Sequence, residues 1–107
     1  MTTAQLDKTF GALADPTRRE ILRRLSSGDA TLTELAERFP VSIQAIAKHL
    51  KVLEGAGLVT RGQMAQLRPV HLHAEALKEA GEWIDAYRSF WERGFEQMER
   101  RLKGPGA

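Results

Sequence analysis

The chain contains no cysteine among its 107 residues. Without thiols it has no disulfides, no thiolate metal sites and no thiol-based redox sensing. No stretch approaches the roughly 18 consecutive apolar residues that a membrane-spanning helix requires. Residues 1–8 lack the apolar core of a secretory signal. We therefore expect a cytoplasmic protein that has no association with membranes.

A catalytic constellation is also missing. Nucleophilic catalysis needs a nucleophile beside a base that a third group orients, and no such set is visible. Three aspartates stand isolated near helix ends or on a solvated face: Asp15, Asp29 and Asp85. The sequence also has no glycine-rich loop that would bind phosphates. We therefore expect neither an enzyme nor a bound cofactor.

The composition is that of an ordinary globular domain, with 42% hydrophobic and 28% charged residues. We expect one domain over residues 1–103 and a disordered tail at 104–107. The net charge is only +2, but it is unevenly distributed. A local basic excess such as this one is expected of a surface that contacts phosphates. Between residues 42 and 74 the only acid is Glu54, and the cations are Lys48, Lys51, Arg61 and Arg68.

Residues 42–54 have the pattern of a recognition helix. Ser42 is a capping residue at the start, and Gly55–Gly57 ends the helix. A narrow apolar stripe anchors it, made of Ile46, Leu50 and Leu53. The other face offers short polar and basic side chains, namely Gln44, Ala45, Lys48, His49 and Lys51.

A helix with one thin buried edge can lie in a DNA major groove. Gln44 is suited to two hydrogen bonds with adenine, and Lys48 to the acceptors of guanine. Ser42 can donate to a phosphate near the positive end of the helix dipole. The alternative is a solvated amphipathic helix whose polar face binds nothing. The elements on either side of this helix favour DNA.

The preceding residues predict three shorter helices. One covers residues 4–13, and a second starts at Asp15-Pro16, a carboxylate cap followed by proline. After a short extended piece at Thr31-Leu32, we expect Thr33 to cap a brief helix over Glu34–Phe39. Pro40 cannot continue that helix. A short helix, a tight turn and a recognition helix together form a helix-turn-helix.

The residues after the recognition helix predict a β-hairpin. Leu58–Thr60 and Leu67–Leu72 have the pattern of strands, joined by residues 61–66. A β-hairpin that directly follows a recognition helix is called a wing. Its tip, residues 63–66, carries no basic side chain, so we expect phosphate contacts from Arg61 and Arg68 at the strand ends.

Residues 74–103 predict one long helix with an apolar stripe. The stripe is too large to be buried within so short a chain, so we expect it to form a dimer with help from the first helix. Burial of apolar area at about 25 cal/mol per Å² would outweigh the entropy of association. The alternative is an effector pocket lined by the aromatic residues. The predicted dimer residues are Leu6, Phe10, Ile84, Tyr87, Trp91, Phe95 and Met98.

Two histidines alternate on the second strand and therefore point the same way. His71 and His73 could bind zinc with a third ligand such as Glu75. We favour instead a surface pair near phosphate or a pair at a dimer edge. We predict no metal site.

Several of these segments together resemble the arsenical-resistance repressor (ArsR) family of bacterial regulators. The similarity lies in Leu13–Leu22, in Leu32–Ala36, in Ser42–Leu53 and in Gly57–Val59. It covers about residues 5 to 73. The resemblance implies a mainly α fold with a small β-hairpin, a winged helix-turn-helix of order α-α-α-α-β-β-α. It also implies a dimer formed through the terminal helices.

The C-terminal part resembles a subgroup of that family that lacks metal ligands, and the similarity lies in Arg68–Leu72, Trp83-Ile84 and Tyr87–Glu92. Metal-sensing members have cysteines where this chain has Thr31 and Thr33, and hydroxyls do not replace thiolates for soft metals. The resemblance implies a homodimeric repressor that binds an inverted-repeat operator in double-stranded DNA and controls promoters including its own. A sensor-repressor with a small-molecule or metal pocket at the dimer interface is the alternative. A protein-interaction module without DNA is a second.

Overall fold

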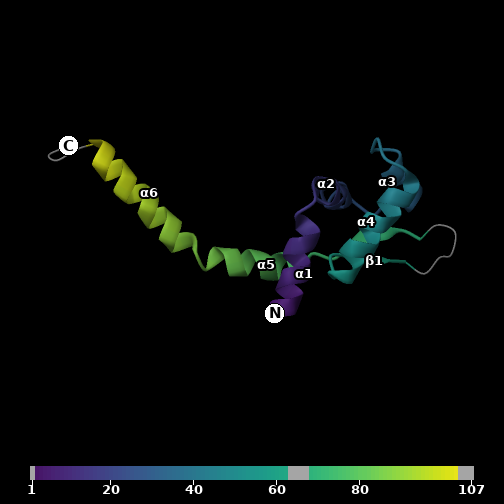
Figure 1. The fold of residues 1–107 in the computed structure, drawn as a ribbon, viewed down its shortest axis with the longest axis horizontal. Helices are drawn as coiled ribbons and strands as arrows, with labels where there is room; N and C mark the ends of the chain where they lie inside the picture. The colour runs from purple at the N-terminus through teal and green to yellow at the C-terminus, as the bar shows by residue number, and fades with distance from the viewer. Residues whose placement is uncertain (1, 63–67, 104–107) are drawn as a thin grey trace.

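The computed structural model describes residues 2–62 and 68–103. The predicted wing tip at 63–66, the start of the second predicted strand at Leu67 and the predicted tail at 104–107 lie outside these residues. Figure 1 shows the helices and the hairpin, with a projecting arm made by the last two helices. The elements are α1 (Thr3–Leu13), α2 (Pro16–Leu25), α3 (Leu32–Ala36), α4 (Ile43–Gly55), β1 (Val59–Arg61), β2 (Val70–Leu72), α5 (Glu75–Asp85) and α6 (Arg88–Lys103).

The core lies where α2, α3, α4 and the hairpin meet. The predicted stripe of α4 is confirmed, because Ile46, Leu50 and Leu53 are fully buried in one cluster. Side chains of α2 and the hairpin complete this cluster. They include Ile21, Leu22, Leu25, Leu58, Val59 and Val70.

The start of α2 and the end of α4 follow from their sequence. Asp15 caps α2 by accepting a hydrogen bond from the Arg18 amide at 3.0 Å, and Pro16 occupies the first turn. At the end of α4, the Leu58 amide donates to the Leu53 carbonyl at 2.9 Å. Gly57 has a φ of +74°, which suits the left-handed residue that this helix ending requires.

The prediction for α3 is wrong at both ends, since the helix ends at Ala36 and not at Phe39. We expected Thr33 to cap a helix beginning at Glu34, but the helix begins at Leu32 and Thr31 is its cap. The Thr31 hydroxyl accepts from the Glu34 amide, and the Glu34 carboxylate accepts from the Thr31 amide, both at 3.2 Å. This reciprocal capping box satisfies two backbone donors, which favours the helix capped by Thr31 over one that starts later and is capped by Thr33.

The wing is a two-stranded antiparallel hairpin in which Val59 pairs with Leu72 and Arg61 with Val70. The first strand has the predicted length but lies one residue later than Leu58–Thr60, and the second begins at Val70, after Arg68 and Pro69, which were predicted to belong to it. Ala30, which precedes α3, forms a single antiparallel bridge to Val70. This bridge attaches the base of the hairpin to the segment that leads into α3. The hairpin side chains Val59 and Val70 are buried and face the core.

The predicted single helix over residues 74–103 is two helices, and that prediction is wrong in this respect. The break lies at Ala86 and Tyr87, where the amide of Tyr87 donates to the carbonyl of Ile84, only three residues earlier. Phe90 likewise donates to Tyr87. The tighter turn redirects the chain, so that α6 extends away from the body (Figure 1).

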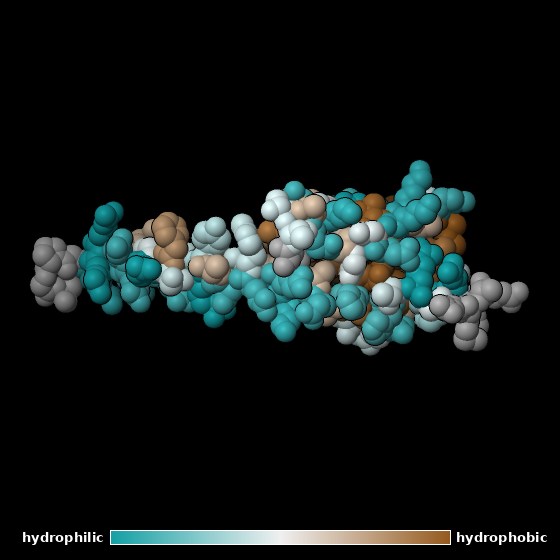
Figure 2. Space-filling model, turned by 90° about the horizontal axis from the view of Figure 1, so that it is seen from below, coloured by the Kyte–Doolittle hydropathy of each residue, from teal (hydrophilic) through white to brown (hydrophobic). Residues whose placement is uncertain are grey.

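The arm makes the molecule long and thin, with extents of 69 × 32 × 20 Å. All residues of α6 are exposed, and Figure 2 shows apolar side chains on the otherwise hydrophilic arm. The described elements form a winged helix-turn-helix, as predicted. Within the described residues, no helix combines the length and apolar character needed to cross a bilayer.

The capping box gives a stability test. Thr31→Ala should lower the free energy of unfolding by about 1 kcal/mol, because it leaves a helix-terminal amide without its acceptor. Urea denaturation at fixed protein concentration measures the change. Thr33→Ala is the matched control and should change stability by less than about 0.5 kcal/mol. Equal losses in the two variants would show that Thr31 does not act as the cap.

The box also predicts a pH dependence. The hydrogen bond from the Thr31 backbone lowers the pKa of Glu34 below its usual value. A carboxylate whose pKa is lowered by folding stabilises the protein above its ordinary pKa, and this contribution is lost as pH falls through the carboxyl range. The difference in the free energy of unfolding between wild type and Glu34→Gln, measured by urea denaturation, should therefore shrink on acidification.

Candidate nucleic-acid interface

The exposed face of α4 carries most of the predicted DNA-binding side chains. Ser42, Gln44, Lys48 and Lys51 are exposed, and Ala45 is half-buried. The Ser42 hydroxyl caps α4 by accepting from the Ala45 amide at 3.1 Å. Its hydrogen is left available for a donor role at the N-terminus of α4, where the helix dipole favours anions.

A cationic groove separates α4 from the base of the wing. It has a volume of about 370 Å³. The structure thus brings together four of the predicted DNA-binding residues that are up to 20 positions apart in the sequence. Its lining residues are Ala47, Lys48, Lys51, Glu54, Arg61 and Arg68.

The side chains of the two wing arginines in this groove differ in how freely they can move. The Arg61 side chain is only 20% exposed, and its Nε lies 3.9 Å from a carboxylate oxygen of Glu54. Arg68 is exposed, and its Nε donates to the Gly62 carbonyl at 3.3 Å. Arg68 can therefore extend a charged group to a phosphate more easily than Arg61 can.

His49 does not share the open face of α4. Its side chain is 22% exposed and turns toward the start of α2. Its Nδ1 lies 3.3 Å from Nη1 of Arg18 and 3.8 Å from a carboxylate oxygen of Asp15. The sequence predicted a DNA contact for His49, whereas its immediate contacts are with α2.

Arg18 is half-buried and turns toward α1 and α4. Its Nε donates to the Ala12 carbonyl at 2.7 Å, and its Nη2 donates to the Gly11 carbonyl at 3.2 Å. Together with His49, it joins the C-terminal end of α1 to α4. The helical pattern could not reveal this, because α1 ends just before α2 and offers its last carbonyls to a nearby donor.

The charges in this cluster are complementary. The Arg18 backbone amide, as a hydrogen-bond donor, lowers the pKa of the Asp15 carboxyl, and the nearby His49 and Arg18 charges act in the same direction. Asp15 therefore stays ionised at neutral pH while it caps α2. We refer to Asp15, Arg18 and His49 as the α2 cluster.

The sequence pattern did not identify two apolar side chains at the start of α4 as surface residues. Val41 and Ile43 are both 41% exposed. Ile43 continues the spacing of the buried stripe and would be expected inside, but it lies one turn beyond the edge of the core. Exposed apolar side chains on a helix in the major groove are of the kind that contact a thymine methyl group.

The histidines of the wing do not gather as a metal site. His71 Nδ1 lies 2.7 Å from an Asp29 carboxylate oxygen, which ties β2 to the loop after α2. His73 is exposed. In residues 2–62 and 68–103, no group of three potential metal ligands is close together.

Comparison with known proteins agrees with this geometry. A family model described as a helix-turn-helix domain matches residues 13–62. The transcriptional repressor SdpR of Bacillus subtilis is 33% identical over 79 residues, covering 74% of this chain and 88% of the relative. The HTH-type transcriptional regulator Rv2034 of Mycobacterium tuberculosis is 38% identical over 95 residues, covering 86% of each. A crystal structure of an ArsR family transcriptional regulator is 35% identical, with a TM-score of 0.78, and the match covers 86% of this chain and 95% of that one.

The chain belongs to the ArsR family. It is a transcriptional regulator with a helix-turn-helix DNA-binding domain. The absence of cysteine fits an ArsR-family subgroup without the thiolate metal site. Among the described elements, α3 and α4 are the helix-turn-helix and the β1–β2 hairpin is the wing.

The α2 cluster predicts a stabilising role for Arg18. Arg18→Ala should lower the free energy of unfolding by about 2 kcal/mol, because it removes charge-assisted hydrogen bonds to two carbonyls. Arg18→Lys should restore less than half of this, since an ammonium cannot bridge the carbonyls and His49 in one plane. Chemical denaturation measures both.

Arg23→Ala is the matched control. Arg23 lies on the same helix, and its side chain is 82% exposed. This change should alter stability by less than about 0.5 kcal/mol. A loss in Arg18→Ala no larger than that of the control would contradict the bridging role.

Proposed function

We propose that this ArsR-family regulator is a homodimeric repressor that binds an inverted-repeat operator. The observation that carries the proposal is the groove between α4 and the wing, where Lys48, Lys51, Arg61 and Arg68 are brought together. The exposed start of α4 lies next to it. A phosphate strand could follow the groove while α4 lies in the major groove beside it.

The contacts divide by chemistry. Gln44 and Lys48 are exposed on α4 and suited to base edges, and Ala45 is small enough to allow close approach. Ser42, Lys51 and Arg68 are suited to phosphates. The half-buried Arg61 supports the groove wall and reaches a phosphate only if its weak ion pair with Glu54 opens. His49 lies at the edge of the exposed face of α4. It would contact DNA there only through the side of its ring that carries Nε2, since Nδ1 faces Arg18 and Asp15.

Lys48 provides the test of DNA recognition. Lys48→Ala should weaken binding to the operator by about 1–3 kcal/mol without unfolding the protein, because the side chain makes no ion pair among the described residues. The operator is first selected from a random DNA pool, and affinity is then measured by fluorescence anisotropy. Lys103→Ala, at the end of the arm, removes the same charge and should leave affinity nearly unchanged. Unaltered operator affinity in Lys48→Ala would sink the assignment of α4 as the recognition helix.

Dimerisation is proposed from the unpartnered arm. The predicted dimer residues of α5 and α6 are all exposed in the single chain. Trp91, Phe95 and Met98 recur at intervals of four and three residues and therefore lie along one side of α6, whereas Ile84 belongs to α5 and Tyr87 to the break between the two helices. Their exposed fractions are 43% for Ile84, 51% for Tyr87, 41% for Trp91, 65% for Phe95 and 57% for Met98. An apolar stripe of this length on a soluble protein indicates an interface.

The first helix contributes differently from the arm. Phe10 packs edge-on against Trp83 of α5, with ring centroids 5.6 Å apart, and Leu6 is half-buried. These contacts lie within one chain and fix α1 against α5. A second copy could then pack against the combined α1–α5 surface and along α6. Two-fold symmetry of such a dimer would place two copies of α4 about one DNA turn apart.

The arm gives the dimer test. Trp91→Glu should yield a folded monomer, because Trp91 lies on the exposed stripe of α6 and outside the core cluster. Light scattering gives the mass, and circular dichroism reports folding. Ser89→Glu makes the same charge change on the opposite side of α6 and should remain dimeric. A dimer of Trp91→Glu, or a monomeric wild type, would refute the assignment.

Repression would follow from occlusion, since a dimer bound at a promoter covers sites that polymerase needs. Autorepression predicts that the selected operator occurs upstream of the protein's own coding sequence. The alternative is a sensor-repressor whose pocket lies at the dimer interface. That function predicts that a metal or an aromatic compound raises the melting temperature and changes operator affinity.

A further inference from the structure

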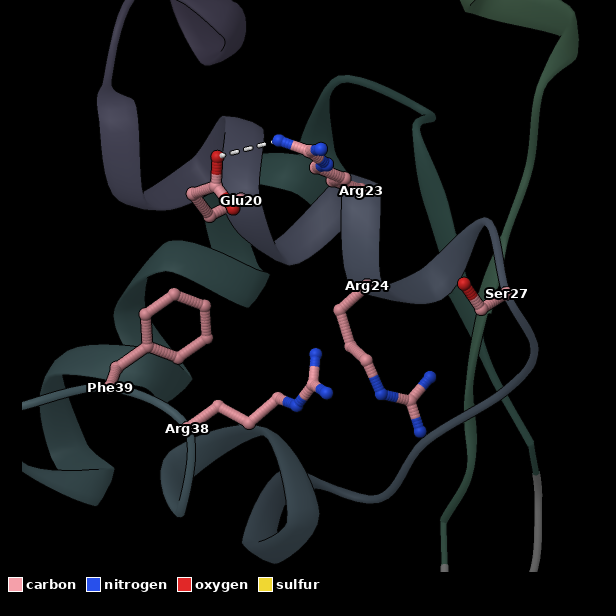
Figure 3. Close-up of a pocket in the computed structure, with 6 residues that line it drawn as sticks. All are labelled: Glu20, Arg23, Arg24, Ser27, Arg38 and Phe39. Carbon is pink, nitrogen blue, oxygen red and sulfur yellow. Dashed lines mark ion pairs between the residues drawn. The ribbon is translucent and has the colours of Figure 1, made fainter.

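A second cationic site lies apart from the groove between α4 and the wing. It is a concave pocket of about 350 Å³ between the outer side of α2 and the end of α3 (Figure 3). It takes in no residue that was predicted to bind DNA. Its lining residues are Glu20, Arg23, Arg24, Ser27, Arg38 and Phe39.

The pocket is distinct from the groove between α4 and the wing. The two share no lining residue. The residues of α2 that line the pocket, such as Arg23 and Arg24, lie off the edge through which Ile21 and Leu25 are buried in the core cluster.

The charges in the pocket are not balanced. The side chains of Arg24 and Arg38 extend into the same space from two different helical segments (Figure 3). Neither makes an ion pair within 4 Å among the described residues. The carboxylate of Glu20 lies 3.9 Å from Arg23, and both of these side chains are largely exposed. Like charges brought together in a concavity favour a bound anion.

The side chain of Arg24 is held by the backbone. It donates from Nη1 to the Gly28 carbonyl at 3.0 Å, which limits its motion and leaves its other nitrogens free. The Arg38 main-chain amide donates to the Leu35 carbonyl at 3.1 Å, so the end of α3, from which the Arg38 side chain extends, is fixed. Two guanidinium groups that reach the same space can bind a phosphate or carboxylate by paired hydrogen bonds.

The pocket also has an apolar wall. Phe39 is half-buried and packs on the core cluster, with its ring at the edge of the site. A volume of about 350 Å³ is large enough for a small molecule. We propose that this pocket binds a small organic anion, a phosphate or carboxylate joined to an apolar group that packs against Phe39.

The site is placed to influence α4. Phe39 stands three residues before Ser42, the cap of α4. An anion that holds Arg38 and Phe39 would fix the turn between the two helices of the helix-turn-helix and so change operator affinity. This consequence rests on the proposed function, whereas binding of the anion does not.

Phenyl phosphate, benzoate and inorganic phosphate are the probes, titrated into the full chain at constant ionic strength without DNA. Amide chemical shifts in two-dimensional NMR report the site. We expect saturable shifts at Arg24, Ser27, Arg38 and Phe39, with phenyl phosphate at least 10-fold tighter than inorganic phosphate. Shifts that grow linearly and spread over all basic surfaces would overturn the proposal.

Arg24→Gln and Arg38→Gln should each weaken phenyl phosphate binding at least 10-fold. The matched control is Arg100→Gln, which removes one exposed charge from α6 and should leave affinity unchanged. Equal losses in all three variants would overturn the site as a general charge effect. Tighter binding of a hexaglutamate peptide than of phenyl phosphate would overturn it in favour of an acidic protein partner.

A final titration tests regulation. Operator affinity is measured with and without saturating phenyl phosphate, and we expect at least a 5-fold change in wild type that is absent in Arg38→Gln. No change in wild type would overturn the link to α4. Failure of the unliganded protein to bind any selected DNA would instead overturn the proposed function, so the two failures are distinguishable.

Discussion

The burial of one thin edge of α4 is the constraint on which the other features depend. Ile46, Leu50 and Leu53 have no exposed surface. Three buried side chains on a helix of 13 residues are enough to hold it, and they leave the rest of its circumference open. If the apolar edge were wider, α4 would sink into the core and its polar side chains would be lost to the surface.

The α2 cluster adds direction to that attachment. Apolar packing is non-directional, so a stripe alone permits α4 to slide or rotate. The contacts of Arg18 with the last carbonyls of α1 and with His49 are directional. Since α1 packs on α5, the chain of contacts runs from the arm to α4 through a few named side chains.

The sequence was informative where local chemistry decides the structure. The Asp15-Pro16 start of α2, the stripe of α4 and the glycine at its end all follow from capping and periodicity, and the structure confirms them. It was less informative where two acceptable local choices compete. Thr31 and Thr33 can both cap a helix, and the reciprocal bond from Glu34 decides between them. The break between α5 and α6 at Ala86 contains no proline or glycine from which it could be predicted.

The candidate site shows the same division. The residues lining the groove could be listed from their charge, but their assembly depends on how the hairpin packs against α4. The inward turn of His49 and the bridging role of Arg18 arise from tertiary contacts, to which helical periodicity is blind. The pocket of α2 and α3 was invisible for this reason as well, because its arginines are 14 residues apart in sequence.

The break between α5 and α6 has a consequence for how such regulators diversify. Because α6 stands apart from the winged domain, substitutions along its stripe can change which chain it pairs with while α4 stays untouched. Gene duplication could therefore produce paralogues that share an operator preference yet ignore one another as partners. The separation of the arm from the body thus lets partner choice and DNA choice evolve independently.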